Sequence, residues 1–129
     1  MNGRALVDTN VVIALLAGDP AAVENLENKA AVFLCVPVIG ELRYGALASA
    51  RVEQNLARLD DLSKAATVLS CDSDTAVCYS TVKLGLRKKG RPIPENDVWI
   101  AAIARQHGLT LVSRDSHFKE IEGLELELL

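Results

Sequence analysis

The sequence predicts an α/β fold in which a mostly parallel central sheet carries helices on both sides. Short apolar or β-branched runs alternate with longer segments of helical spacing along the 129 residues, which is typical of such a sheet. The run at residues 31–36 is apolar without a break, as in a strand buried on both faces. Half of the residues are hydrophobic and we find no repeat or linker, so we expect one domain spanning residues 1–129.

Five strands are expected, and each is a short apolar or β-branched run. The first ends directly at Asp8. The last alternates leucine with glutamate, which predicts an edge strand with one face in water. The expected strands cover residues 5–7, 31–36, 67–70, 109–112 and 124–128.

Six helices are expected between these strands, and several have recognisable ends. Asp19 followed by Pro20 predicts a helix start, as does Asp72 or Ser73 further along. Gly108 predicts a left-handed helix end. The expected helices cover residues 11–17, 21–29, 37–50, 52–64, 73–89 and 95–107.

Composition excludes several classes of protein. No apolar run is longer than the one at residues 11–17, which is far shorter than the roughly 20 residues that cross a bilayer. No signal-peptide pattern is present, so we expect a cytoplasmic protein. Cys35, Cys71 and Cys78 have neither disulfide nor zinc spacing, and we expect inert or buried thiols. A net charge of −3 argues against binding nucleic acid by bulk positive charge. It leaves a nuclease open, because an acidic metal site itself lowers the net charge.

Two acids follow directly after predicted strands. Asp8 follows the first strand and Asp115 comes just after the fourth. Ligands of parallel α/β sheets bind beyond the carboxyl ends of the strands, which favours a functional role for both. Helix capping or a turn is the structural alternative for each residue.

Two further acids lie in predicted helices. Glu41 has apolar neighbours, and a carboxylate beside a buried face is costly unless it is paired or bound to a metal. An ion pair with Arg43 is the alternative. Asp97 lies in the first turn of an apolar helix, where the helix dipole stabilises an acid by about 0.3–1 kcal/mol. Capping by Asp97 or Asn96 explains it equally well.

Together the four acids predict a cation site. Two carboxylates about 4 Å apart repel by roughly 4 kcal/mol at an effective dielectric constant of 20, so a cluster needs a cation or raised pKa values. Oxygen ligands favour Mg²⁺, or Mn²⁺, over zinc. Such ions commonly polarise a phosphate and ionise a water, which indicates phosphodiester hydrolysis.

Four segments around these acids resemble the motifs of PIN-domain nucleases. Their order and spacing are similar to those of VapC-type toxins of toxin–antitoxin pairs, and the match runs from Asp8 to Phe118. The resemblance implies a three-layer α/β/α sandwich and a metal-dependent endoribonuclease, usually a homodimer, that a cognate VapB-like antitoxin inhibits. The segments are DTN at 8–10, ELRYGA at 41–46, NDVWIAA at 96–102 and SRDSHF at 113–118.

The resemblance also implies roles for single residues. Thr9 and Asn10 match polar residues beside the first acid, and we interpret them as side chains that orient the acids. Apart from the resemblance, we expect His117 to be exposed, and no set of partner residues in the sequence suggests that it acts as a general base. Binding of Mg²⁺ and activation of water are implied for Asp8, Glu41, Asp97 and Asp115.

Basic residues are the candidates for RNA contacts. The run Arg87, Lys88, Lys89 and Arg91 is either a solvated helix end or a contact to the phosphate backbone. Arg114 either neutralises the neighbouring acid or contacts a phosphate.

The Ala- and Leu-rich helices in residues 11–29 and 37–64 predict apolar surface for a homodimer partner and an antitoxin helix. The alternative is that all of this surface is core.

Three other functions are weaker. A receiver domain needs an acceptor Asp after the third strand, which Asp72 provides, but also a Lys near residue 113, where none stands. A phosphatase with an Asp nucleophile needs an acid at the position of Asn10. A non-catalytic interaction module would use the acids only as caps.

Overall fold

The protein folds around one parallel five-stranded sheet. A computed structural model describes residues 3–129. The strand order is β3-β2-β1-β4-β5, and every pair of neighbouring strands is parallel. The α/β fold with a mostly parallel sheet is therefore confirmed. The strands are β1 (Arg4–Val7), β2 (Ala31–Cys35), β3 (Thr67–Leu69), β4 (Thr110–Ser113) and β5 (Leu126–Leu128).

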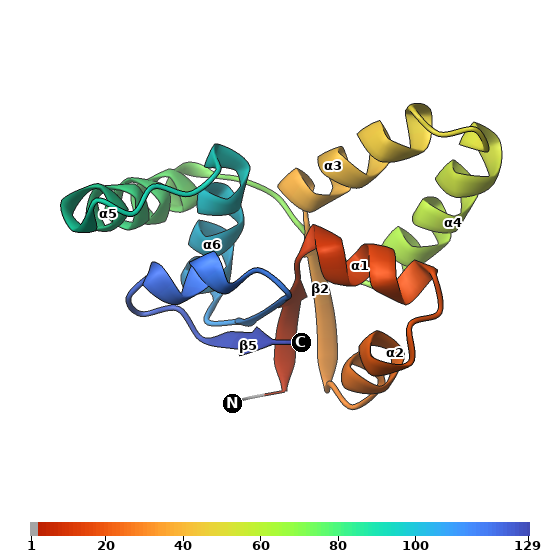
Figure 1. Cartoon of the computed structure of the whole chain (residues 1–129), viewed down its shortest axis with the longest axis horizontal. Helices are drawn as coiled ribbons and strands as arrows, with labels where there is room; N and C mark the ends of the chain where they lie inside the picture. Colours follow the sequence, from red (N-terminus) through yellow and green to blue (C-terminus); the bar gives the residue numbers. More distant parts are fainter. Residues whose placement is uncertain (1–2) are drawn as a thin grey trace.

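Helices cover both sides of the sheet, which gives the expected three-layer sandwich (Figure 1). Each expected helix is present within a few residues of its predicted ends. Asp19 and Asp72 cap α2 and α5 as predicted, and Gly108 ends α6 with a φ of 64°. The helices are α1 (Thr9–Leu16), α2 (Pro20–Glu27), α3 (Val36–Leu47), α4 (Val52–Ala65), α5 (Ser73–Lys89) and α6 (Glu95–His107).

A short 3₁₀ helix, η1 (Ser116–Glu120), follows β4 and was not expected from the sequence. Its Phe118 side chain is completely buried in the core, so η1 is held against the sheet. The sequence of η1 has no helical pattern of its own. The burial of the Phe118 side chain, which is a tertiary contact, determines the position of this turn.

The central strands bring the site together. Val7 at the end of β1 is in register with Val112 of β4, and the backbone N–H of Asp8 donates to the Val112 carbonyl over 2.9 Å. Residues that directly follow these two strands therefore lie side by side at one edge of the sheet.

Strand β5 differs from the expected alternation. Its Glu127 is partly buried, pairs with Lys29 over 2.6 Å and accepts a hydrogen bond from Asn25. Leu128 is instead 39% exposed. The prediction that the glutamates of this strand face water is wrong for Glu127. Polar side chains of α2 and of the residues after α2 approach the strand there.

The remaining expectations concern the cysteines and membranes. All three cysteines are free; Cys35 is buried, Cys78 is partly buried and Cys71 is exposed. Over residues 3–129, no helix combines the length and apolar character that spanning a membrane requires.

Candidate active site

Asp8 is a buried carboxylate at the end of β1, only 3% exposed. Its Oδ2 accepts a hydrogen bond from the Ser113 hydroxyl over 2.6 Å, and its Oδ1 accepts one from the backbone N–H of Thr9 over 2.8 Å. Asp8 is also the N-cap of α1, so the structural explanation is correct as far as it goes. Helix capping does not explain the hydrogen bond that Asp8 accepts from Ser113 at the end of β4.

Asn10 connects α1 to Asp115. Its Nδ2 donates to Asp115 Oδ2 over 3.2 Å, and its Oδ1 accepts from the backbone N–H of Arg114 over 3.2 Å. The backbone N–H of Asp115 donates to Ser113 Oγ over 3.0 Å. The side chain of Asn10 therefore orients Asp115. Thr9 contacts Asp8 through its backbone only, and its buried hydroxyl has no hydrogen-bond partner among the described residues.

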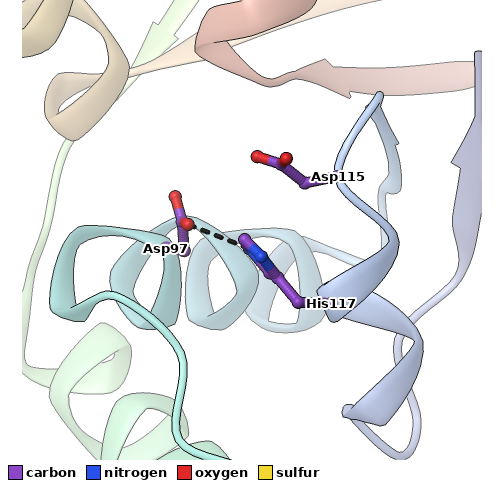
Figure 2. Close-up of side chains that lie close together, drawn as sticks. All are labelled: Asp97, Asp115 and His117. Carbon is purple, nitrogen blue, oxygen red and sulfur yellow. Dashed lines mark ion pairs between the residues drawn. The ribbon is translucent and has the colours of Figure 1, made fainter.

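Asp97 projects from the first turn of α6 toward η1, where it meets His117 (Figure 2). Asp97 Oδ2 lies 2.9 Å from His117 Nε2. Among residues 3–129, the ligand atoms of Asp97, Asp115 and His117 all lie within 4.8 Å of one another. The expected exposure of His117 is wrong: the side chain is partly buried and its ring packs 4.7 Å from that of Phe118.

Glu41 lies next to buried residues of α3 as expected, but the residue itself is exposed, so the expected cost of burying its carboxylate is wrong. Its apolar neighbours Val38 and Leu42 lie one turn apart and turn inward together, which leaves Glu41 on the outer side of α3. The alternative ion pair with Arg43 is also wrong, because Arg43 pairs with Asp60 over 3.4 Å.

The Glu41 carboxylate is held by Asn96. The side-chain amide of Asn96 donates to Glu41 Oε1 and approaches the Pro37 carbonyl at 3.5 Å. Because Asn96 directly precedes Asp97, this contact ties the start of α3 to the start of α6. In the sequence, the Asn-Asp pair at 96–97 is equally consistent with capping, but capping is wrong here, because Pro94 is the N-cap of α6 and no side chain caps this helix start.

Electrostatics join the four acids into one cluster. Burial raises the pKa of Asp8, and the charges of Asp115 and Glu41 raise it further, although the hydrogen bonds from Ser113 and Thr9 oppose this. The pKa of Asp97 is raised to about 6, mainly by burial. Repulsion from Asp8, Glu41 and Asp115 also raises this pKa, whereas the nearby His117 lowers it. Asp8 and Asp97 are therefore each destabilised as anions by the other acids, while among residues 3–129 the group of possible ligand atoms within 4.8 Å of one another holds Asp97, Asp115 and His117 but neither Asp8 nor Glu41.

Comparisons with known proteins agree with this geometry. A family model described as "PIN domain" matches residues 5–124. The chain belongs to the PIN-domain family. Ribonuclease VapC2 of Haemophilus influenzae is 35% identical over 127 residues, with 96% of each chain covered. A VapC of Shigella flexneri named as a tRNA(fMet)-specific endonuclease is 31% identical, again with 96% of each chain covered.

The solved structures include a chain with the same fold. The structure of VapBC2 from Rickettsia felis, bound to a DNA fragment from its promoter, matches this PIN domain with a TM-score of 0.91 and 28% identity. The match covers 98% of both chains. Fold and sequence together therefore place this PIN domain in the VapC branch of the family.

The donor atoms of the acidic cluster fit a hard divalent cation. Carboxylate oxygens are the ligands that Mg²⁺ and Mn²⁺ take in proteins, and the mutual repulsion of these acids is what such a charge relieves. The neighbouring arginines do not relieve it, because Arg114 pairs with Asp19 over 2.7 Å and Arg43 with Asp60. Of the two alternatives for Arg114, neutralisation of Asp115 is therefore wrong, and contact with a phosphate stays a prediction.

The basic run of this PIN domain lies away from the acids. Figure 1 shows the end of α5 at the outer left of the molecule, whereas α6 lies nearer its centre. Lys89 Nζ donates to the Glu120 carbonyl over 2.7 Å and lies 3.9 Å from a Glu122 oxygen. Lys89 therefore fastens α5 to the end of η1, while Lys88 lines a cavity of about 640 Å³ beside it.

Proposed function

We propose that this PIN domain is a metal-dependent endoribonuclease and acts as the toxin of a toxin–antitoxin pair. The observation that carries the proposal is the convergence of Asp8, Asp97 and Asp115 from three separate elements, with the pKa values of Asp8 and Asp97 raised. The relatives named as ribonucleases support RNA as the substrate.

The competing functions lose support. A receiver domain needs a free acceptor at Asp72, but this carboxylate accepts hydrogen bonds from Thr75 N and Gln106 Nε2, each over 2.9 Å. An interaction module gives no reason to bury Asp8, because a cap residue is satisfied at the surface. Isolated buried charge is costly, whereas a cation would compensate for it.

We assign cation binding to Asp8, Asp97 and Asp115, with Mg²⁺ or Mn²⁺ as the ion. When bound, the ion supplies positive charge that polarises a phosphate oxygen and lowers the pKa of a water molecule. Ser113 and Asn10 hold Asp8 and Asp115 in their orientations.

Glu41 accepts the proton of the attacking water in this proposal. It is exposed to substrate and held by Asn96, so its free oxygen faces solvent at the edge of the cluster. The water oxygen forms a new bond to phosphorus and a proton of the water moves to the Glu41 carboxylate. The bond from phosphorus to the leaving ribose oxygen breaks, and this oxygen takes a proton from solvent.

The apolar groove between α1, α3 and α4 is the proposed antitoxin site. It is a cavity of about 360 Å³ with Ile13, Leu16 and Leu59 in its wall, and it reaches Glu41. The Ile13 side chain in this groove is 57% exposed, whereas isoleucine is among the residues most often buried in folded proteins. An amphipathic helix in this groove would cover Glu41 and so inhibit the site.

A homodimer surface is proposed on α3. Tyr44 and Leu47 are 75% and 60% exposed there, which leaves apolar surface for a second copy of the chain.

The basic residues at the end of α5 and just after it remain candidates for contacts to RNA outside the catalytic centre. They are Arg87, Lys88, Lys89 and Arg91.

The test is incubation of the purified chain with transfer RNA and with messenger RNA fragments, with Mg²⁺ or with a chelator. We expect cleavage with Mg²⁺ that the chelator and Asp8→Asn each abolish. The matched control Asp60→Asn, which removes an exposed acid that pairs with Arg43, should cleave as the unchanged chain does. Cleavage that persists in Asp8→Asn would overturn the proposal. Sequencing the 5′ ends produced in cells would identify the RNA.

A further inference from the structure

We propose that His117 is itself a ligand of the divalent cation and that its imidazole biases the site toward Mn²⁺ over Mg²⁺. The inference rests on the proposed metal-dependent function, and it concerns a side chain outside the four acids that the sequence pointed to.

The first support is the position of the ring nitrogen. His117 Nε2 is shielded from solvent and lies 2.9 Å from Asp97 Oδ2, and the nearest ligand atom of Asp115 is within 4.8 Å. Two neighbouring ligands of an octahedral ion with bonds of about 2.1 Å lie about 3 Å apart. The separation of the nitrogen and the Asp97 oxygen therefore equals an edge of such a coordination shell.

The direction of this contact is the second support. Nε2 has no hydrogen-bond partner among the described residues although the Asp97 oxygen is so close, because the two groups are not aligned for an N–H donor. In an imidazolium–carboxylate pair, the N–H points at the oxygen. Two ligands of one ion instead point at the ion between them, so each is poorly aligned with the other.

The fold fixes the ring in this position. Phe118 is completely buried and its ring lies 4.7 Å from that of His117, tilted by 51°. His117 projects from η1 toward Asp97 (Figure 2), and the buried Phe118 anchors this short helix against the core. A ligand held in place before binding loses less conformational entropy when the ion arrives.

Nitrogen changes the preference among cations. Mg²⁺ takes oxygen ligands almost without exception, whereas Mn²⁺ accepts imidazole together with carboxylates. A site in which one imidazole joins the carboxylates therefore gains more from Mn²⁺ than an all-oxygen site does.

Pulsed electron paramagnetic resonance of the Mn²⁺-loaded protein tests this directly, because a directly bound ¹⁴N nucleus modulates the echo. We expect an imidazole ¹⁴N coupling that disappears when the histidines carry ¹⁵N. The coupling should be absent in His117→Gln and present in His107→Gln, which alters the only other histidine, at the opposite end of α6. His117→Gln should weaken Mn²⁺ binding about tenfold and Mg²⁺ binding much less.

The possible outcomes distinguish a failure of the inference about His117 from a failure of the proposed nuclease function. Bound Mn²⁺ without any ¹⁴N coupling, in a chain that still cleaves RNA, overturns the role of His117 and leaves the nuclease standing. A ¹⁴N coupling in a chain that cleaves no RNA overturns the nuclease alone. Failure to bind Mn²⁺ at all contradicts both. The measurement on the unchanged chain needs no variant, so a misfolded His117→Gln would not obscure the result.

Discussion

The carboxylate of Asp8 accepts a 2.6 Å hydrogen bond from the hydroxyl of Ser113, although 105 positions separate the two residues along the chain. Both side chains are buried, and Ser113 Oγ also accepts from the backbone N–H of Asp115. One hydroxyl thus positions both acids that follow the central strands.

Replacing this hydroxyl should affect stability and metal binding together. Ser113→Ala leaves a buried carboxylate with one partner fewer, which we expect to cost about 1–3 kcal/mol of unfolding free energy. The pKa of Asp8 should rise further, since this hydrogen bond lowers it. Chemical denaturation and Mn²⁺ titration measure the two effects. Ser116→Ala, at an exposed position, is the control, and an equal loss in both variants would contradict the account.

Metal-free stability should fall as the pH rises. The pKa of Asp97 is raised from 3.8 to about 6, so its proton favours the folded state. This stabilisation is complete below pH 4 and is lost as the pH passes through about 6; Asp8 acts in the same direction. In thermal melts, Mg²⁺ or Mn²⁺ should therefore raise the melting temperature at pH 7.5 more than at pH 5.

Asp97→Asn is the matched variant for that series. Without metal it should be more stable than the unchanged chain at pH 7.5, on the order of 1 kcal/mol after allowance for solvent screening, because a repelled charge is gone. It should also bind no ion tightly. A variant less stable than the unchanged chain at pH 7.5 would indicate that Asp97 is a structural residue.

Asn96 should act through Glu41. Its amide donates to the Glu41 carboxylate, so Asn96→Ala frees that side chain without removing it. We expect kcat for RNA cleavage to fall about tenfold while KM changes little, since one transition-state contact is loosened. Asn96→Gln should recover part of the rate. Steady-state kinetics on a short RNA give both constants, and a change in KM alone would argue against the positioning role.

A substitution in the apolar groove should weaken antitoxin binding without affecting RNA cleavage. Ile13→Glu places a charge in its apolar wall, and the position is exposed, so folding and RNA cleavage should persist. Binding of the antitoxin peptide should weaken at least tenfold by calorimetry, because burying an unpaired carboxylate is costly. Val77→Glu, at a position 65% exposed on α5 outside the groove, should bind normally. Equal weakening in both variants would place the antitoxin elsewhere.

Much of the fold could be predicted because its signals are local. Apolar runs of strand length, the cap at Asp72 and the glycine at 108 each depend on neighbours in the chain. The convergence of Asp8 and Asp115 followed from one topological rule, since parallel strands end at the same edge.

The remainder depends on tertiary contacts that no local pattern contains. His117 lies beside Asp97 because Phe118 is buried and holds η1 against the core. Glu41 faces outward because its neighbours are drawn inward. Arg114 turns to Asp19 instead of the adjacent acid, which spacing along the chain does not indicate.

The central claim is that Asp8, Asp97 and Asp115 enclose one divalent cation site. Anomalous diffraction from crystals grown with Mn²⁺ tests it most directly. The account predicts an anomalous peak between these three carboxylates, with an oxygen of each within about 2.3 Å of it or linked to it through a bound water. A peak only at other side chains, or none at saturating Mn²⁺, would contradict it.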